Sequence, residues 1–202
     1  MKNRTIILIL TIAFFAFQGN GLAGTHQRDT WYIGFGLGGA FDASYEIDGQ
    51  ENTFDDWLEF WGFDKDPKIS LNFKVGKTLS PKNLLGFDIT AVSQTGSIPG
   101  GDGHIQISNF FLMFTHFPQE EGFFIRAGGG LSTLTAELDW GFGDVSDSAS
   151  GFGLLGGIGY AFWLGKSFNL TLNIDYSMQF YDGGNDPDNS QFAIFYLGFD
   201  WY

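Results

Sequence analysis

The chain contains no cysteine, and its three histidines, His26, His104 and His116, are scattered along 202 residues. Disulfides and thiolate chemistry are therefore excluded, and a zinc site is not supported, because zinc ligands recur at close spacings. Positive charge is also scarce: 10 Lys and Arg residues stand against 23 Asp and Glu residues, for a formal net charge of −13. This balance argues against nucleic acid as a partner. We expect no cofactor and no resident metal.

An apolar stretch near the start of the chain, Thr5 to Phe17, is shorter than the ~20 residues of a spanning helix. It follows a basic start, Met1 to Arg4, and precedes small residues that end at Ala23. These are the parts of a secretory signal peptide. We predict that residues 1–23 are such a signal, removed after Ala23, and that 24–202 form one exported domain; an uncleaved N-terminal anchor is the alternative.

Aromatic residues and glycine are abundant, with 24 Phe, 7 Tyr, 6 Trp and 30 Gly, whereas only 16% of the residues are charged. A surface of this composition exposed to water would be prone to aggregate, so the aromatic residues need a non-aqueous environment. Bulky apolar residues recur at every second position, which is the period of β-strands. With the turn residues, this alternation predicts eight strands of about membrane-crossing length, at 31–44, 68–78, 84–94, 104–117, 123–135, 150–163, 168–181 and 191–202.

The two faces of these strands differ in chemistry. In the second strand, Ile69, Leu71 and Phe73 share one face, while Ser70, Asn72 and Lys74 share the other. A soluble lipocalin-like barrel would place its apolar face inside and charged residues outside. Here the second face is nearly uncharged and rich in glycine, as the crowded interior of an eight-stranded barrel requires. The fold class expected is therefore all-β, an eight-stranded antiparallel transmembrane up-and-down β-barrel.

The predicted connections alternate between short and long. Residues 79–83, 118–122 and 164–167 are tight turns, whereas the longer, polar connections are 45–67, 95–103, 136–149 and 182–190. Outer-membrane barrels have short periplasmic turns and long outer loops. The sequence thus predicts which end of the barrel faces the cell surface.

Two strands depart from a simple pattern. The segment from Phe110 to Phe114 is apolar at every position, so apolar and polar residues do not alternate along it. We therefore expect a β-bulge there, or an aromatic side chain that points into the barrel. In the last strand, the terminal Tyr202 shares its face with Gly198 and Asp200, which do not suit lipid. The opposite face is apolar and is the one expected to face lipid: Phe195, Leu197, Phe199 and Trp201. This strand is expected to close the barrel against the first.

The chain resembles the small outer-membrane β-barrel proteins of the OmpA-like type. The resemblance lies in the segment 122–132, a loop, the glycine-rich segment 151–160, the strand 169–176 and the aromatic terminus. It implies a Gram-negative outer-membrane location, contact with outer-membrane lipid and lipopolysaccharide, and assembly by the barrel-assembly machinery. Members of this kind include adhesins and structural barrels, so the resemblance indicates an architecture rather than an activity.

Charged residues are few on the inward face: Lys74, Asp88, Arg126 and Asp175. The turn near Pro81 places Lys74 opposite Asp88 in an antiparallel ladder. Burying unpaired charges inside a barrel costs free energy, so these four residues are expected to form an ion-pair network. The lumen would then be plugged by this network and would not be a wide pore. A proton or ion path through these residues is the alternative.

The long connections carry most of the acidic residues, opposed there by Lys65 and Lys68. A cation, a basic extracellular protein or divalent-bridged lipopolysaccharide would suit such a surface. Asp182, Asp186 and Asp188 offer a weak candidate cation site, but their spacing does not match a calcium-binding loop, and a solvated turn is the simpler interpretation.

The first long connection is predicted to contain a short amphipathic helix at 54–61. Thr53 and Asp56 have the spacing of a capping pair, and Gly62 supplies a stop. One face of this helix carries Phe54, Trp57, Leu58 and Trp61. That face either covers the barrel mouth or the lipid interface, or forms a recognition patch for a partner.

No enzyme is predicted. A lipid-modifying hydrolase is the alternative class, and it would need a histidine near a nucleophile or paired acids. Ser108 lies on the same strand face as His104, but ~13 Å away at about 3.3 Å per residue. The function expected is structural, or recognition at the cell surface through the acidic loops.

Overall fold

The structure is a computed structural model that describes residue 28 and residues 31–140, 143–181 and 187–202. The predicted signal peptide, 1–23, lies outside these residues. Within the described part of the chain, no helix has the length and apolar character needed to cross a membrane.

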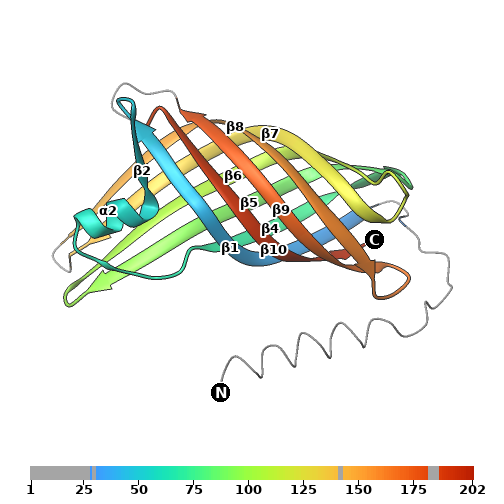
Figure 1. Cartoon of the computed structure of the whole chain (residues 1–202), viewed down its shortest axis with the longest axis horizontal. Helices are drawn as coiled ribbons and strands as arrows, with labels where there is room; N and C mark the ends of the chain where they lie inside the picture. Colours follow the sequence, from blue (N-terminus) through green and yellow to red (C-terminus); the bar gives the residue numbers. More distant parts are fainter. Residues whose placement is uncertain (1–27, 29–30, 141–142, 182–186) are drawn as a thin grey trace, which may run out of the picture.

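Eight long antiparallel strands form one closed sheet (Figure 1). Each pairs with its neighbour in the sequence, and the last pairs with the first, which closes the barrel. The predicted fold class is confirmed. The strands are β1 (Trp31–Ile47), β4 (Ile69–Ser80), β5 (Asn83–Ile98), β6 (Gly101–His116), β7 (Gly122–Asp139), β8 (Asp144–Trp163), β9 (Phe168–Tyr181) and β10 (Asn189–Trp201).

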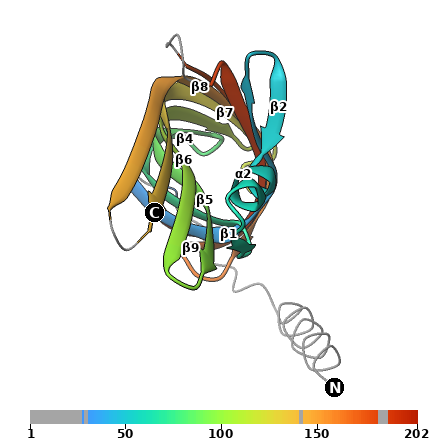
Figure 2. The same ribbon diagram turned by 90° about the vertical axis from the view of Figure 1, so that its left-hand side faces the viewer.

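The connection between β1 and β4 holds the remaining elements. They are the short strand β2 (Gln50–Thr53), the helix α2 (Phe54–Phe60) and the two-residue strand β3 (Asp64–Lys65). β2 extends a hairpin from β1, and β3 pairs with the far end of β5. These pairings hold α2 beside one opening of the barrel (Figure 2).

The strands alternate between exposed apolar and buried polar positions, as the sequence predicts. On β9, Ile174, Tyr176 and Met178 are exposed, while Asn173, Asp175 and Ser177 are fully buried. The outward apolar series on β9 runs from Leu170 to Phe180, or ~33 Å along the strand, which gives a band ~25 Å tall at the usual tilt. That height is the usual height of the apolar band on outer-membrane barrels. The lipocalin-like alternative is wrong, because it requires the opposite assignment of faces.

Inward aromatic packing resolves the irregular stretch of β6. Phe111 and Met113 are buried, Phe110 and Leu112 are exposed, and the register with both neighbouring strands is unbroken. Register shifts lie instead in β1, between Phe41 and Ser44, where Asp42 has a positive φ of 65°, and in β4, between Thr78 and Ser80. Of the two outcomes expected for β6, the inward aromatic residue is the one observed.

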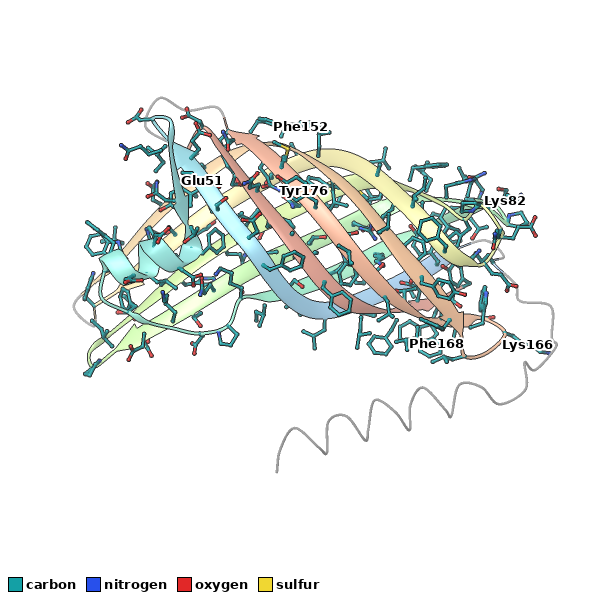
Figure 3. The ribbon with its side chains drawn as sticks, in the orientation of Figure 1. Glu51, Lys82, Phe152, Lys166, Phe168 and Tyr176 are labelled. Carbon is teal, nitrogen blue, oxygen red and sulfur yellow. The ribbon has the colours of Figure 1, made fainter. Side chains whose placement is uncertain are left out.

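The barrel has two different ends (Figure 1). The turn end carries the connections 81–82, 117–121 and 164–167 and the C-terminus, whereas the loop end carries β2, α2 and β3. The labelled Lys82 and Lys166 lie at the turn end, and Glu51 lies toward the loop end (Figure 3).

Two of the predicted loops are wrong in extent. Residues 95–98 and 101–103 belong to β5 and β6, and 136–139 and 144–149 belong to β7 and β8. The outward positions in these segments are polar, and a run of polar residues resembles a loop in the sequence. Inward residues there, such as Leu138 and Ala149, stay apolar and buried, so the strands continue beyond the apolar band.

The last strand has the phase expected from the sequence. Phe195, Leu197, Phe199 and Trp201 point outward, and Asp200 is buried. The ring of Tyr202 lies 5.8 Å from that of Tyr32 and 5.7 Å from that of Trp163, by centroid. The terminal tyrosine therefore helps to fill the turn end of the barrel.

Candidate functional site

The inward charges gather in the part of the lumen near the turn end. The Arg126 guanidinium from β7 contacts Asp88 of β5, and its Nε lies 3.5 Å from Oδ1 of Asp175 on β9. Arg126 is 4% exposed, Asp88 2% and Asp175 0%. One arginine thus bridges two carboxylates, each from the second strand along on either side of β7.

Lys74 is placed differently from the expectation. It lies opposite Asp88 in the ladder, as predicted, but its ion pair is with Asp200, at 3.7 Å from Nζ to Oδ1. Its Nζ also lies 5.3 Å from the centroid of the Tyr196 ring. The sequence interpretation missed Asp200 as a network residue; its inward phase in the terminal strand was the available signal.

Two inward glycines allow these ion pairs to form across an intervening strand. Gly34 of β1 lies opposite both Lys74 and Asp200, and Gly157 of β8 lies opposite both Arg126 and Asp175. A Cβ at Gly34 would come within 2.0 Å of Oδ1 of Asp200. Glycine is required at these positions because the charged side chains occupy the space where a Cβ would stand.

Side chains leave little free volume around the network. A cavity of about 20 Å³ lies among residues that include Tyr32, Lys74 and Arg126, which is room for about one water molecule. Toward the turn end, the Arg28 guanidinium lies 3.5 Å from the centroid of the Phe117 ring and donates to the carbonyl of Pro81 at 3.1 Å. The cluster of Tyr32, Leu84, Phe117, Phe124 and Ala161 packs at this end.

At the loop end, α2 begins at the predicted residue, Phe54, and ends at Phe60, one residue before the predicted end. Thr53 is the N-cap, its hydroxyl accepts from the Asp56 amide at 3.1 Å, and the Asp56 carboxylate accepts from the Thr53 amide at 2.9 Å. Gly62 follows with a φ of +78°, a conformation that favours glycine. Hydrogen bonds from Thr53 lower the pKa of Asp56.

The four predicted patch residues do not form one exposed surface. Phe54 and Leu58 are fully buried in the mouth of the barrel, where Phe54 joins Val92 and Ile105 in the core. Trp57 is half-buried and Trp61 is exposed. The apolar face of α2 therefore covers the mouth, which is the first of the two roles considered for it.

A different aromatic set reaches the surface at this end. Phe60 is 80% exposed and Trp61 39% exposed, and their ring centroids lie 5.2 Å apart. Trp140, between β7 and β8, contacts Trp61 edge-on at 6.2 Å. We call Phe60, Trp61 and Trp140 the distal aromatic cluster. The sequence did not point to Phe60, because it lies outside the predicted apolar face of α2. It did not point to Trp140 either, because that residue lies in a separate connection.

Acidic residues surround the distal aromatic cluster, and the lysines nearby are already paired. Lys65 lies 3.1 Å from Glu59, and Lys68 contacts Asp55. Partial burial works to raise the pKa of Asp55, but hydrogen bonds from Lys68 and Gln94 outweigh it and lower that pKa. The loop end is consequently anionic without a free lysine on the α2 segment.

An open cavity of about 650 Å³ lies among the loop-end parts of β5, β6, β7 and β8, and four acidic residues line it: Asp66, Asp102, Glu137 and Asp139. In the described part of the chain, no three His, Asp or Glu residues are placed to hold a metal ion. Of the weak cation candidates, Asp182 and Asp186 lie outside the described residues. The Asp188 amide donates to the carbonyl of Glu46 at 2.8 Å.

The two described histidines have partners of their own. His104 Nδ1 lies 3.7 Å from Glu137, and His116 Nδ1 lies 2.8 Å from the Asn83 side-chain oxygen. Thr95 is directly opposite His104 in the ladder, but its hydroxyl donates to Asp66 at 2.8 Å. The hydroxyl opposite this histidine in the ladder is therefore engaged by a carboxylate.

The barrel is similar to solved structures of small outer-membrane proteins. Ail, the attachment invasion locus protein of Yersinia pestis, superposes with a TM-score of 0.56 at 12% identity, over 86% of this chain and 99% of that chain. Neisserial surface protein A superposes with a TM-score of 0.53 at 15% identity, over 85% of this chain and 96% of that chain. The fold is that of the small eight-stranded outer-membrane β-barrels.

The likeness extends to this broad class of barrels and does not single out the OmpA-like type. No protein-family description matches the chain, and no curated protein sequence matches it either.

Proposed function

We propose that this protein is an integral barrel of a Gram-negative outer membrane, exported with removal of residues 1–23, whose loop end recognises a cationic partner. The apolar outward band, the polar interior and the likeness to small outer-membrane barrels support the location. Lipid and lipopolysaccharide surround the band, and the barrel-assembly machinery inserts it. The loop end then faces the cell surface, because outer loops in such barrels are longer than periplasmic turns.

The distal aromatic cluster is the observation that carries the recognition role. Phe60 and Trp61 stand exposed on a segment whose other side is anchored by Phe54 and Leu58 in the barrel mouth. Exposed aromatic residues on a rigid support are typical of binding surfaces, since their burial by a partner removes apolar area from water at little cost in entropy.

The charge around the cluster defines the chemistry of the partner. Glu59 and Asp64 flank the aromatic residues, and the net charge of the chain is −13. A lysine- or arginine-rich segment would pair with the carboxylates and place its cations over the aromatic rings. The solved structure of Ail contains a heparin analogue, sucrose octasulfate, which is a polyanion. The acidic loop end of this protein is suited to ligands of the opposite charge.

Binding of a fluorescently labelled oligolysine peptide to the detergent-folded barrel tests this role. The wild type is expected to bind saturably and to lose affinity as salt is added, because exposed ion pairs are screened. The double variant F60S/W61S should bind at least ~10-fold more weakly, a loss of ~1.4 kcal/mol.

A matched control is Leu164→Ser, which removes an exposed apolar side chain at the turn end. It should bind as the wild type does, and all three proteins should melt at the same temperature. Equal binding by wild type and F60S/W61S, or preference for heparin over oligolysine, would contradict the proposal.

We also propose that the lumen is closed to ions. The charged network leaves a cavity of about 20 Å³, Arg28 and Phe117 pack at the turn end, and α2 covers the loop end. In planar bilayers the protein should give no steady current above background. A reproducible porin-like conductance at neutral pH would show that an ion path exists.

We propose that the protein is not an enzyme. The alternative of a lipid-modifying hydrolase would need a nucleophile beside His104 or His116, and Asp66 engages the hydroxyl of Thr95 opposite His104. The role we favour is recognition, with the barrel as a rigid support.

A further inference from the structure

The outward face of four neighbouring strands changes its chemistry along one row of the sheet. Ile89, Phe110, Leu131 and Phe152 form one continuous register row across β5, β6, β7 and β8, and all four are exposed and apolar. The next row toward the loop end is Ala91, Ser108, Thr133 and Ser150, and the row after it is Ser93, Gln106, Thr135 and Ser148. The apolar band thus gives way to hydroxyl and amide side chains within two residues.

We call the seven polar residues of these two rows the hydroxyl wall: Ser93, Gln106, Ser108, Thr133, Thr135, Ser148 and Ser150. None of the seven carries a charge, and each is exposed or half-buried. The amide of Gln106 donates to the Ser108 hydroxyl at 2.7 Å, and the Thr133 and Ser150 hydroxyls lie 3.3 Å apart. The ionisable residues Asp102, His104 and Glu137 lie only in the rows beyond.

The hydroxyl wall is a rigid surface because its other side belongs to the core. Val92, Ile107, Leu134 and Ala149, which alternate with the wall residues along the same strands, are buried in the cluster that receives Phe54 of α2. The ladder between β6 and β7 is unbroken from Asp102 to His116. A ligand would therefore meet side chains that are already held in place, with little loss of entropy on binding.

The composition of the wall indicates the kind of partner. Protein interfaces are enriched in aromatic residues and arginine and depleted in serine, and the wall has no aromatic residue and no arginine. Hydroxyl and amide groups both donate and accept hydrogen bonds, which matches the hydroxyl groups of sugars. A charged wall would be attracted to or repelled by ionic headgroups, whereas a neutral wall tolerates phosphate nearby.

The position of the wall identifies one source of such sugars. It continues the apolar band on the same strands and on the same face, toward the end that we assign to the cell surface. The outer-leaflet lipid of a Gram-negative outer membrane carries a saccharide headgroup at this level. We propose that the hydroxyl wall is the contact surface for the saccharide headgroups of the surrounding lipopolysaccharide, an inference that rests on the proposed outer-membrane location.

Native mass spectrometry of the folded barrel with purified lipopolysaccharide tests the inference. The variant S108A/T133V/T135V/S148A removes four hydroxyls at nearly constant volume and keeps β-branched residues where strands favour them. The wild type should retain bound lipopolysaccharide, and the variant should bind it at least ~10-fold more weakly, about 1.4 kcal/mol less favourable. Binding of phosphatidylglycerol should be equal in both, because the apolar band is unchanged.

The hydroxyl-conserving variant S108T/T133S/T135S/S148T is the matched control and should bind lipopolysaccharide as the wild type does. Equal retention by wild type and S108A/T133V/T135V/S148A would overturn the inference, and so would a wild-type dimer that the same four substitutions dissociate, since the wall would then bind a second copy. Oligolysine binding should be unchanged in the variant, so a failure of this inference is separable from a failure of the recognition role. Outer-membrane fractionation checks the location independently.

Discussion

Replacing Arg126 with methionine is expected to lower the free energy of unfolding by ~3–5 kcal/mol, the usual cost of removing one partner from a buried ion pair. Arg126 contacts Asp88 and lies 3.5 Å from Asp175, and both carboxylates are fully buried. Without the guanidinium, two negative charges would remain in the barrel interior with no cation between them. Lys74 cannot replace it, because its Nζ is paired with Asp200 at 3.7 Å.

Equilibrium unfolding in urea, followed by tryptophan fluorescence of the barrel in lipid vesicles, measures this loss. The triple variant R126M/D88N/D175N is the control, because it removes Arg126 together with both of its carboxylate partners at little change in volume. It should recover more than half of the lost stability, since the only charges left among these residues, Lys74 and Asp200, are paired with each other. If the free energy of unfolding of R126M lies within ~1 kcal/mol of the wild-type value, Arg126 does not stabilise the two buried carboxylates, and the network interpretation is wrong.

Replacing Gly157 with valine is expected to prevent folding of the barrel. A Cβ at this position would come within 1.9 Å of Oδ1 of Asp175 and 3.0 Å of the carbonyl oxygen of Ile174. Asp175 would have to leave its place and lose Arg126, which reaches it across β8 at this residue. Overpacking adds ~1–3 kcal/mol to the lost pair, so the total approaches the ~5–15 kcal/mol that stabilises a typical protein.

Gly156→Val is the matched control for this second prediction. Gly156 is adjacent in the chain but faces outward, and a Cβ there would meet no atom within 4 Å. Valine also favours strands, so this variant should fold as the wild type does. Folding is measured by refolding into detergent and by the gel shift that folded barrels show on boiling. Comparable folded fractions for G157V and G156V would contradict the role assigned to the inward glycine.

The inward and outward phases were predictable residue by residue, because alternation along a strand is a local property. Phe195 and Trp201 point outward and Asp175 inward as the period of two requires. The capping pair of α2 was also predictable, since Thr53 and Asp56 interact within one turn. The ends of β5, β6, β7 and β8 were not, because a polar outward face beyond the membrane looks like a loop when the buried inward residues are not recognised.

The composition of the candidate sites depended on contacts between distant strands. Lys74 faces Asp88 across the β4–β5 turn, which the sequence indicates, but it pairs with Asp200 because Gly34 leaves the space between them open. Trp61 meets Trp140 only when the connection after β1 folds back toward the connection between β7 and β8. No spacing in the chain relates Trp61 to Trp140.

By itself, the sequence determined the class of structure: strands with one apolar face, eight in number, suited to closing around a polar interior. Those features follow from the alternation of side chains along each strand, which involves only near neighbours. Only the tertiary structure decided which charges pair, which aromatic residues stay exposed and where the outward face becomes polar. Each of these depends on the register between strands and on the space left by glycines such as Gly34 and Gly157, and both are set when the sheet closes.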